Sequence, residues 1–191
     1  MKIAIVAMAL VFCGTAFAGA PQCRLTAADK AANARLSYDD FDQKGTLPSS
    51  WRALSNAGCD RLAAEAAEDY MLHHAPLTES QRGTLLFHEA QSLAQAGEER
   101  QAARLVAAAR YLKQKPDDSF DWNTYVEGTW AFLVKDRIRL DAAVAKLSAA
   151  KSEENAINAR VLRGLAKCFT RSYKAAYTPE CGGPLTKRRG G

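Results

Sequence analysis

Apolar residues recur at helical spacing through most of the chain, and this pattern sets the expected fold class. The segment 87–110 is typical of two short amphipathic helices that meet at Gly97. Alanine is abundant, whereas glycine and proline are rare inside the periodic segments. No run of alternating β-branched residues indicates a strand. The pattern therefore predicts an all-α protein.

Turn-forming and capping residues divide this pattern into segments. Thr26 and Thr78 are suitable N-caps, and Gly45 and Pro48 interrupt the pattern ahead of residue 50. We therefore expect an N-terminal helix and loop over 19–49, three helix pairs over 50–154, a C-terminal helix over 155–176 and a tail over 177–191.

The three predicted helix pairs recur at a constant interval. Gly58, Gly97 and Asp136 stand at their junctions, 39 residues apart in both cases. Large apolar residues stand four positions before the junctions: Leu54, Leu93 and Phe132. The small position after the junction is alanine in the first two pairs and Asp141 in the third. Equal spacing of helix pairs indicates a repeat architecture.

The central pair resembles a tetratricopeptide repeat. Its matching positions are Leu86, Ala90 and Leu93 in the first helix, Gly97 in the turn, and Ala102, Val106 and Ala109 in the second helix. The resemblance implies a short right-handed solenoid of antiparallel helix pairs whose first helices line a groove for another protein. The chain also resembles a group of exported bacterial proteins with tetratricopeptide-like folds and no assigned activity, which implies no catalytic residues. The 39-residue interval and Asp136 at a turn depart from the repeat pattern.

The first 18 residues have the features of a secretory signal peptide. Lys2 precedes an apolar stretch over 3–12, and Ala16 and Ala18 form a cleavage site. The expected mature chain begins at Gly19 and is periplasmic or secreted, and its length of about 170 residues fits one domain. No other segment approaches the length of a membrane-spanning helix, so membrane contact would be peripheral.

Cysteines in an exported chain favour disulfides. The four beyond the signal peptide are Cys23, Cys59, Cys168 and Cys181. Four cysteines allow three pairings, and we favour Cys168 with Cys181, which would fasten the tail to the last helix, and Cys23 with Cys59. The alternative is that some of these thiols are free and buried.

Other polar clusters do not predict a catalytic or metal site. His73, His74 and His88 lack the helical spacing of metal ligands, and we expect no metal and no cofactor. The acidic residues Asp39, Asp40 and Asp42 are interpreted as a solvated turn cluster.

Two sets of residues are candidates for binding. Trp122, Tyr125 and Trp130 share one predicted helix; most are expected in the core, with at least one lining the groove. A basic stripe is predicted along the last helix: Arg160, Arg163, Lys167, Arg171 and Lys174. Its interpretations are a solvated face, or a dock for an acidic protein, an anionic membrane or a cell-wall polymer. No nucleic-acid partner is expected, because the predicted location is outside the cytoplasm and because no aromatic residue interrupts the stripe.

The sequence therefore favours a periplasmic interaction scaffold or adaptor without catalysis. One alternative is an inhibitor or immunity protein against a secreted effector or hydrolase. An undetected envelope enzyme is third.

Overall fold

The computed structural model of the chain describes residues 23–74, 76–115 and 118–182. The predicted signal peptide and residues 183–191 of the predicted tail lie outside these ranges. The helices are α1 (Ala27–Asn33), the π-helix η1 (Asp39–Lys44), α2 (Trp51–Asn56), α3 (Asp60–His73), α4 (Glu79–Gln95), α5 (Glu99–Ala108), α6 (Trp122–Leu133), α7 (Arg137–Ala149), α8 (Glu153–Lys167), α9 (Tyr173–Ala176) and the short 3-10 helix η2 (Pro179–Cys181).

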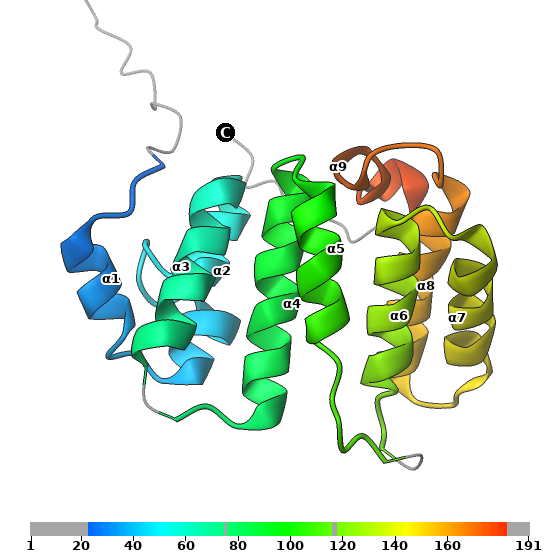
Figure 1. Ribbon diagram of the computed structural model, residues 1–191, viewed down its shortest axis with the longest axis horizontal. Helices are drawn as coiled ribbons and strands as arrows, with labels where there is room; N and C mark the ends of the chain where they lie inside the picture. Colours follow the sequence, from blue (N-terminus) through cyan, green and yellow to red (C-terminus); the bar gives the residue numbers. More distant parts are fainter. Residues whose placement is uncertain (1–22, 75, 116–117, 183–191) are drawn as a thin grey trace, which may run out of the picture.

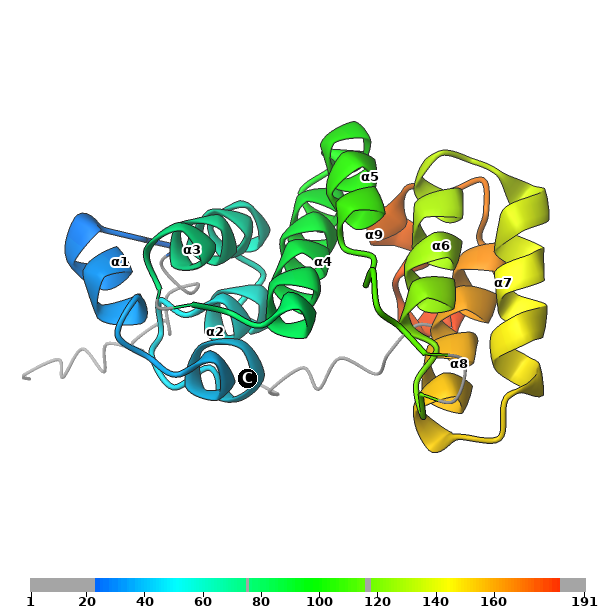
Figure 2. The same ribbon diagram turned by 60° about the horizontal axis from the view of Figure 1, so that its bottom comes forward.

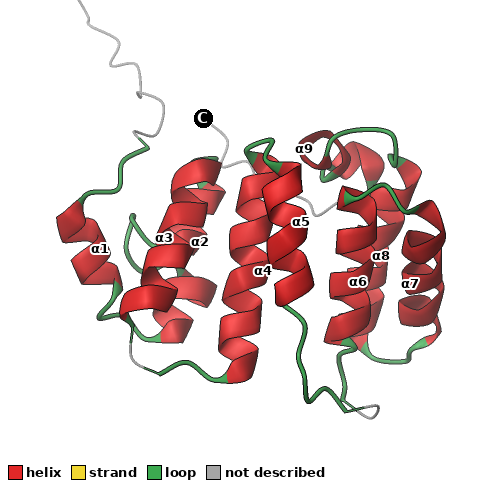
Figure 3. Ribbon diagram, viewed as in Figure 1, coloured by secondary structure: helices red, strands yellow, loops and turns green. Residues whose placement is uncertain are grey.

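The prediction of an all-α fold is confirmed for this part of the chain, which contains no strand (Figure 3). Consecutive helices pack as pairs, α2 with α3, α4 with α5, and α6 with α7, and the pairs stand side by side in a row (Figure 1). Thr26 and Thr78 cap α1 and α4, and each forms a reciprocal capping box with the residue three positions later. None of the helices described has the length and apolar character needed to cross a bilayer.

The turns within the three pairs have the same geometry. Each contains one residue with left-handed backbone: Gly58 (φ 75°), Gly97 (φ 90°) and Lys135 (φ 60°). The amide of the next residue then donates to the carbonyl five positions earlier: Cys59 to Leu54 at 2.9 Å, Glu98 to Leu93 at 2.8 Å, and Asp136 to Ala131 at 2.7 Å. The three pairs are therefore structural repeats of one another at their turns.

The predicted third junction is wrong by one residue. Lys135, not Asp136, has the left-handed backbone, and Asp136 instead caps α7 through a bond to the amide of Arg139. The second interval is thus one residue shorter than the first. This shift places Leu140, which is fully buried, at the position equivalent to Ala102, and leaves Asp141 exposed.

Two hydrophobic clusters fill the interior, and α4 belongs to both. The N-terminal core is built around Phe41, Trp51 and Tyr70, and α4 adds Leu85 to it. The C-terminal core contains Phe87, Ala90 and Leu93 of α4 together with the inner faces of α5 to α9. We call these regions the N-terminal half (η1 and α1–α3) and the C-terminal half (α5–α9).

The C-terminal helix predicted over 155–176 is wrong in its length. The chain leaves helical geometry after Lys167, and a new helix, α9, begins after the N-cap Ser172. The ammonium group of Lys135 stabilises the intervening turn by donating to the carbonyl oxygens of Phe169 (3.1 Å) and Arg171 (2.7 Å). The turn lets α9 lie between the α4–α5 pair and the α6–α8 end of the molecule (Figure 2).

Both favoured cysteine pairs are disulfide-bonded in the structure. Cys23–Cys59 joins the segment before α1 to the start of α3. Cys168–Cys181 joins the end of α8 to η2. Each bond therefore fastens one end of the described chain to the helical body.

Candidate functional site

A line of polar side chains runs along α4 between the two cores. Thr84, His88 and Gln91 are spaced by four and three residues, so they lie on one face of the helix, and all three are half-buried. Different segments of the chain contact each of them. We call these three residues the α4 stripe.

The centre of the stripe is an ion-pair geometry between His88 and Asp42 of η1. The His88 Nδ1 atom lies 2.6 Å from Asp42 Oδ1, and the carboxylate is fully buried while 15% of the imidazole is exposed. Trp51 stacks on the imidazole with ring centroids 4.1 Å apart, and its Nε1 donates to Ser92 at 2.9 Å. The carboxylate and the indole together fix the orientation of the ring.

The interpretation of the acidic cluster as a solvated turn is wrong for Asp42. Asp39 and Asp40 do pair with Lys44 near the surface, at 2.7 and 3.1 Å. The turn of η1 points Asp42 inward. There the His88 ring and the side-chain amide of Gln43 form hydrogen bonds with its carboxylate. His88, which looks isolated in sequence, is therefore paired across 46 residues.

Arg52 adds a cationic group beside this pair. Its Nε donates to the Asp42 carbonyl oxygen at 2.8 Å, and its guanidinium lies 4.1 Å from the centroid of the Trp51 ring. Burial lowers the pKa of Arg52, although Asp42 nearby opposes this shift. No hydrogen bond joins its terminal guanidinium nitrogens to another described residue, and the side chain is part-exposed.

Tyrosines flank both ends of the stripe. At one end the Thr84 hydroxyl lies 3.0 Å from the Tyr111 hydroxyl. Burial, with the charge of Asp42 as a second cause, raises the pKa of the neighbouring Tyr38 to about 12. At the other end the Gln91 amide donates to the Tyr173 hydroxyl at 3.2 Å.

The chain's own C-terminal segment packs against the Gln91 end, where Gln91 itself stays half-buried. Tyr173 is almost fully buried, its amide donates to Glu99 at 2.5 Å, and its ring stacks on Tyr177. The sequence gives no signal for the bonds of Tyr173 to Gln91 and Glu99, because these residues are more than 70 positions apart in the chain.

The structure does not place the predicted aromatic residues on a groove. Trp122 and Tyr125 are buried, because α6 is packed between α5, α7 and α8. The indole of Trp122 donates to the Ala109 carbonyl oxygen at 2.8 Å. Trp130 is half-buried on the other side, with the Arg139 guanidinium 5.3 Å from its ring centroid. Trp122 and Tyr125 therefore lie in the core, where most of these residues were expected, and the part-exposed member of the set is Trp130.

The predicted basic stripe is divided by the turn after α8. Arg160, Arg163 and Lys167 lie exposed on α8, while Arg171 lies in the turn and Lys174 on α9. The Nζ atom of Lys174 lies 3.9 Å from Oδ2 of Asp60 on α3, away from the other four basic residues. The five residues thus do not form one continuous helical stripe.

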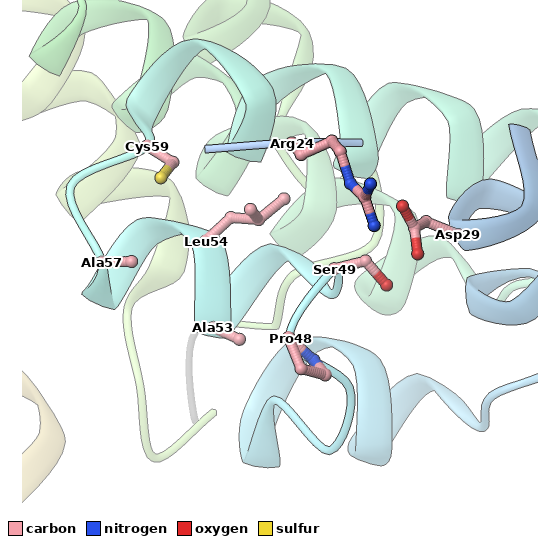
Figure 4. A pocket seen from close by; sticks show the side chains of 8 residues that line it. All are labelled: Arg24, Asp29, Pro48, Ser49, Ala53, Leu54, Ala57 and Cys59. Atoms are coloured by element: carbon pink, nitrogen blue, oxygen red, sulfur yellow. The ribbon is translucent and has the colours of Figure 1, made fainter. Parts of the chain in front are cut away.

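Two surface depressions lie elsewhere. One of 490 Å³ borders the Cys23–Cys59 disulfide, with Leu54 and Cys59 in its wall and Arg24 pointing toward Asp29 (Figure 4). The other, of 380 Å³, lies on α6 and α7, and ion pairs of Arg110 and Arg139 with Glu127 border it. The charged groups that line these depressions lie close to groups of opposite charge, which leaves the α4 stripe as the stronger candidate.

The arrangement at the stripe suits binding. It offers hydrogen-bond donors and acceptors, a cation, and the part-exposed rings of Tyr38 and Tyr111. In the described part of the chain, the His88 ring is hydrogen-bonded to Asp42 and to no hydroxyl or thiol group. Comparison of the chain with family models, with curated proteins and with solved structures finds no match.

Proposed function

We propose that this chain is an exported scaffold that binds another protein, with the α4 stripe and the neighbouring Arg52 as the binding surface. The observation that carries the proposal is the pairing of a buried carboxylate with a part-exposed imidazole, beside the part-exposed side chain of Arg52. Burial of a carboxylate costs desolvation energy, so a buried carboxylate beside a part-exposed ring supports a role in positioning that ring for a ligand.

The proposal includes the finer architecture and the location. Three helix pairs with matching turns support a tetratricopeptide-like right-handed solenoid, in which α2, α4 and α6 are the first helices and line one face. Two disulfides support an oxidising location, the periplasm or the cell exterior. Because such folds serve many purposes, the argument for binding comes from the site rather than from the fold.

A photo-crosslinking experiment tests the proposal. A crosslinking residue replaces Gln95, which is half-buried and continues the α4 stripe by one more turn. The matched control carries the same residue at Ala145, which is exposed on α7. In envelope extracts we expect protein adducts from position 95 that are missing from position 145.

A binding measurement with the captured protein completes the test. Arg52→Glu is expected to weaken its affinity at least about tenfold, since it reverses the charge of this part-exposed side chain, whereas Arg104→Glu on the exposed side of α5 leaves it unchanged. Equal adducts from both crosslinking positions, or equal affinities of both variants, would refute the stripe as the binding surface.

A further inference from the structure

The exposed side of α8 carries positive charge that the fold does not use. Arg160, Arg163 and Lys167 are exposed and fall within one face of the helix. Arg163 donates to the Ser148 hydroxyl at 2.8 Å and Lys167 to the Glu180 carbonyl oxygen at 3.1 Å, and both acceptors are uncharged. Arg171 follows at the end of the helix, where Glu180 lies 3.6 Å away. We call these four cations the α8 face.

The charge balance of the α8 face is strongly positive. Among the described residues, Glu180 is the one carboxylate within ion-pair distance of the four cations. Beyond Gly182 the sequence adds Lys187, Arg188 and Arg189. Within α8 itself, the exposed carboxylates Glu153 and Glu154 lie in the first turn, so the excess of positive charge belongs to the rest of the helix.

The composition of the α8 face favours a lipid surface over a protein partner. Neither of the two depressions described above includes a residue of α8. Its exposed residues include no aromatic ring, the residue type that dominates protein hot spots. Ile157, 43% exposed, precedes Arg160 by one helical turn and offers an aliphatic contact beside the charges. A cationic face with an aliphatic neighbour matches the headgroup region of an anionic bilayer.

We propose that the α8 face binds the surface of membranes that contain anionic phospholipids. The binding is peripheral and electrostatic, and the long axis of α8 lies along the membrane. This inference is independent of the α4 stripe, which lies on a different helix and takes a different ligand.

Vesicle co-sedimentation of the full mature chain tests the proposal. The probes are vesicles of equal parts phosphatidylglycerol and phosphatidylcholine, and vesicles of phosphatidylcholine alone. We expect binding to the anionic vesicles at low salt, loss of this binding in about 0.5 M salt, and no binding to the neutral vesicles. Absence of binding to anionic vesicles at low salt would overturn the proposal.

Two variants of equal charge change locate the binding surface. Reversal of the α8 cations in Arg160→Glu/Arg163→Glu/Lys167→Glu is expected to lower vesicle affinity at least about 100-fold, since each basic group near an anionic surface contributes several-fold. The control reverses three exposed cations on and after α5, Arg100→Glu/Arg104→Glu/Lys113→Glu, and is expected to retain most of the affinity. Thermal unfolding of both variants verifies that they are folded.

Two results would contradict this placement. Equal loss in both triple variants would mean that net charge, not the α8 face, determines binding. If soluble polyglutamate binds the chain and anionic vesicles do not, the face belongs to an acidic protein partner.

Ile157→Ser is expected to lower vesicle affinity two- to fivefold, because a single aliphatic contact is lost.

Discussion

The two halves of the molecule are stabilised differently, although the same helix-pair unit builds both. The N-terminal half has short helices and a core that contains buried polar groups, among them Asn33, Asp42 and Ser50. The C-terminal half has a larger core of aliphatic and aromatic residues, and its α6 and α8 approach closely at Gly128. The C-terminal half also buries the polar residues Thr124, Thr129 and Asn155, but the N-terminal half combines its buried polar groups with the smaller apolar core. The four predictions that follow test this contrast, from the largest expected effect to the smallest.

Loss of the two disulfides should affect the halves unequally. Cys23–Cys59 spans 36 residues and Cys168–Cys181 spans 13. In the chain-entropy account, the double variant Cys23→Ser/Cys59→Ser loses about 4 kcal/mol in the free energy of unfolding, and Cys168→Ser/Cys181→Ser loses about 3 kcal/mol. Urea denaturation of both variants measures the difference. The reverse order would mean that strain or residual structure outweighs loop length.

Removal of the buried carboxylate tests the polar N-terminal core. Asp42→Ala leaves the His88 imidazole and the Gln43 amide without their acceptor, and we expect a loss of about 3 kcal/mol in the free energy of unfolding. The control is Asp39→Ala, whose ion pair with Lys44 is exposed and which should change stability by less than about 0.5 kcal/mol. Equal effects of the two substitutions would show that the buried pair does not stabilise the fold.

A methyl group at Gly128 tests the close packing of the C-terminal half. The Cβ of Gly128→Ala would overlap Cδ1 of Leu162 and lie 3.0 Å from Cβ of Ala143, so we expect a loss of about 2 kcal/mol. The added Cβ of Gly97→Ala would meet no other atom. This variant is expected to lose about 1 kcal/mol in the free energy of unfolding, because alanine disfavours the left-handed backbone at this position. Thermal unfolding compares them, and a neutral Gly128→Ala would contradict tight contact between α6 and α8.

The helix shared by both halves should introduce a pH dependence. Burial, with repulsion from Glu68 as a second cause, raises the pKa of Glu89 from 4.5 to about 7. The folded state therefore holds a proton that the unfolded state releases, so stability falls as pH rises from about 4.5 to about 7. Glu89→Gln is expected to gain on the order of 1 kcal/mol at pH 8 and nothing at pH 4, because part of the carboxyl group remains solvated. The free energies of unfolding of wild type and variant are measured by urea denaturation across this pH range. If the two change in parallel with pH, the assignment is refuted.

Features that depend on local sequence could be predicted, and features that depend on distant pairing could not. Helical periodicity and capping residues gave the all-α class and the caps at Thr26 and Thr78. The third junction was misplaced because glycine marks a left-handed turn residue, whereas Lys135 adopts that backbone without a glycine signal.

The candidate site depends entirely on distant contacts. Asp42 in its own segment looks like a surface turn residue, and its burial follows from the packing of η1 against α4. Trp122 and Tyr125 have the composition of an interface, but α6 has neighbours on several sides and buries both. The break after Lys167 depends on Lys135, which reaches the carbonyl groups of the turn from another helix pair.

The docking of α9 has a consequence for the order in which the chain acquires its structure. Tyr173 donates its amide to Glu99, a partner made 74 residues earlier, and Tyr173 and Ala176 are part of the C-terminal core. During synthesis the ribosome still holds this segment when α4 to α7 have already emerged. The C-terminal half therefore cannot complete its packing on the nascent chain, and a long unfinished interval precedes the final collapse. The final packing of the C-terminal half therefore follows completion of the chain rather than accompanying its synthesis.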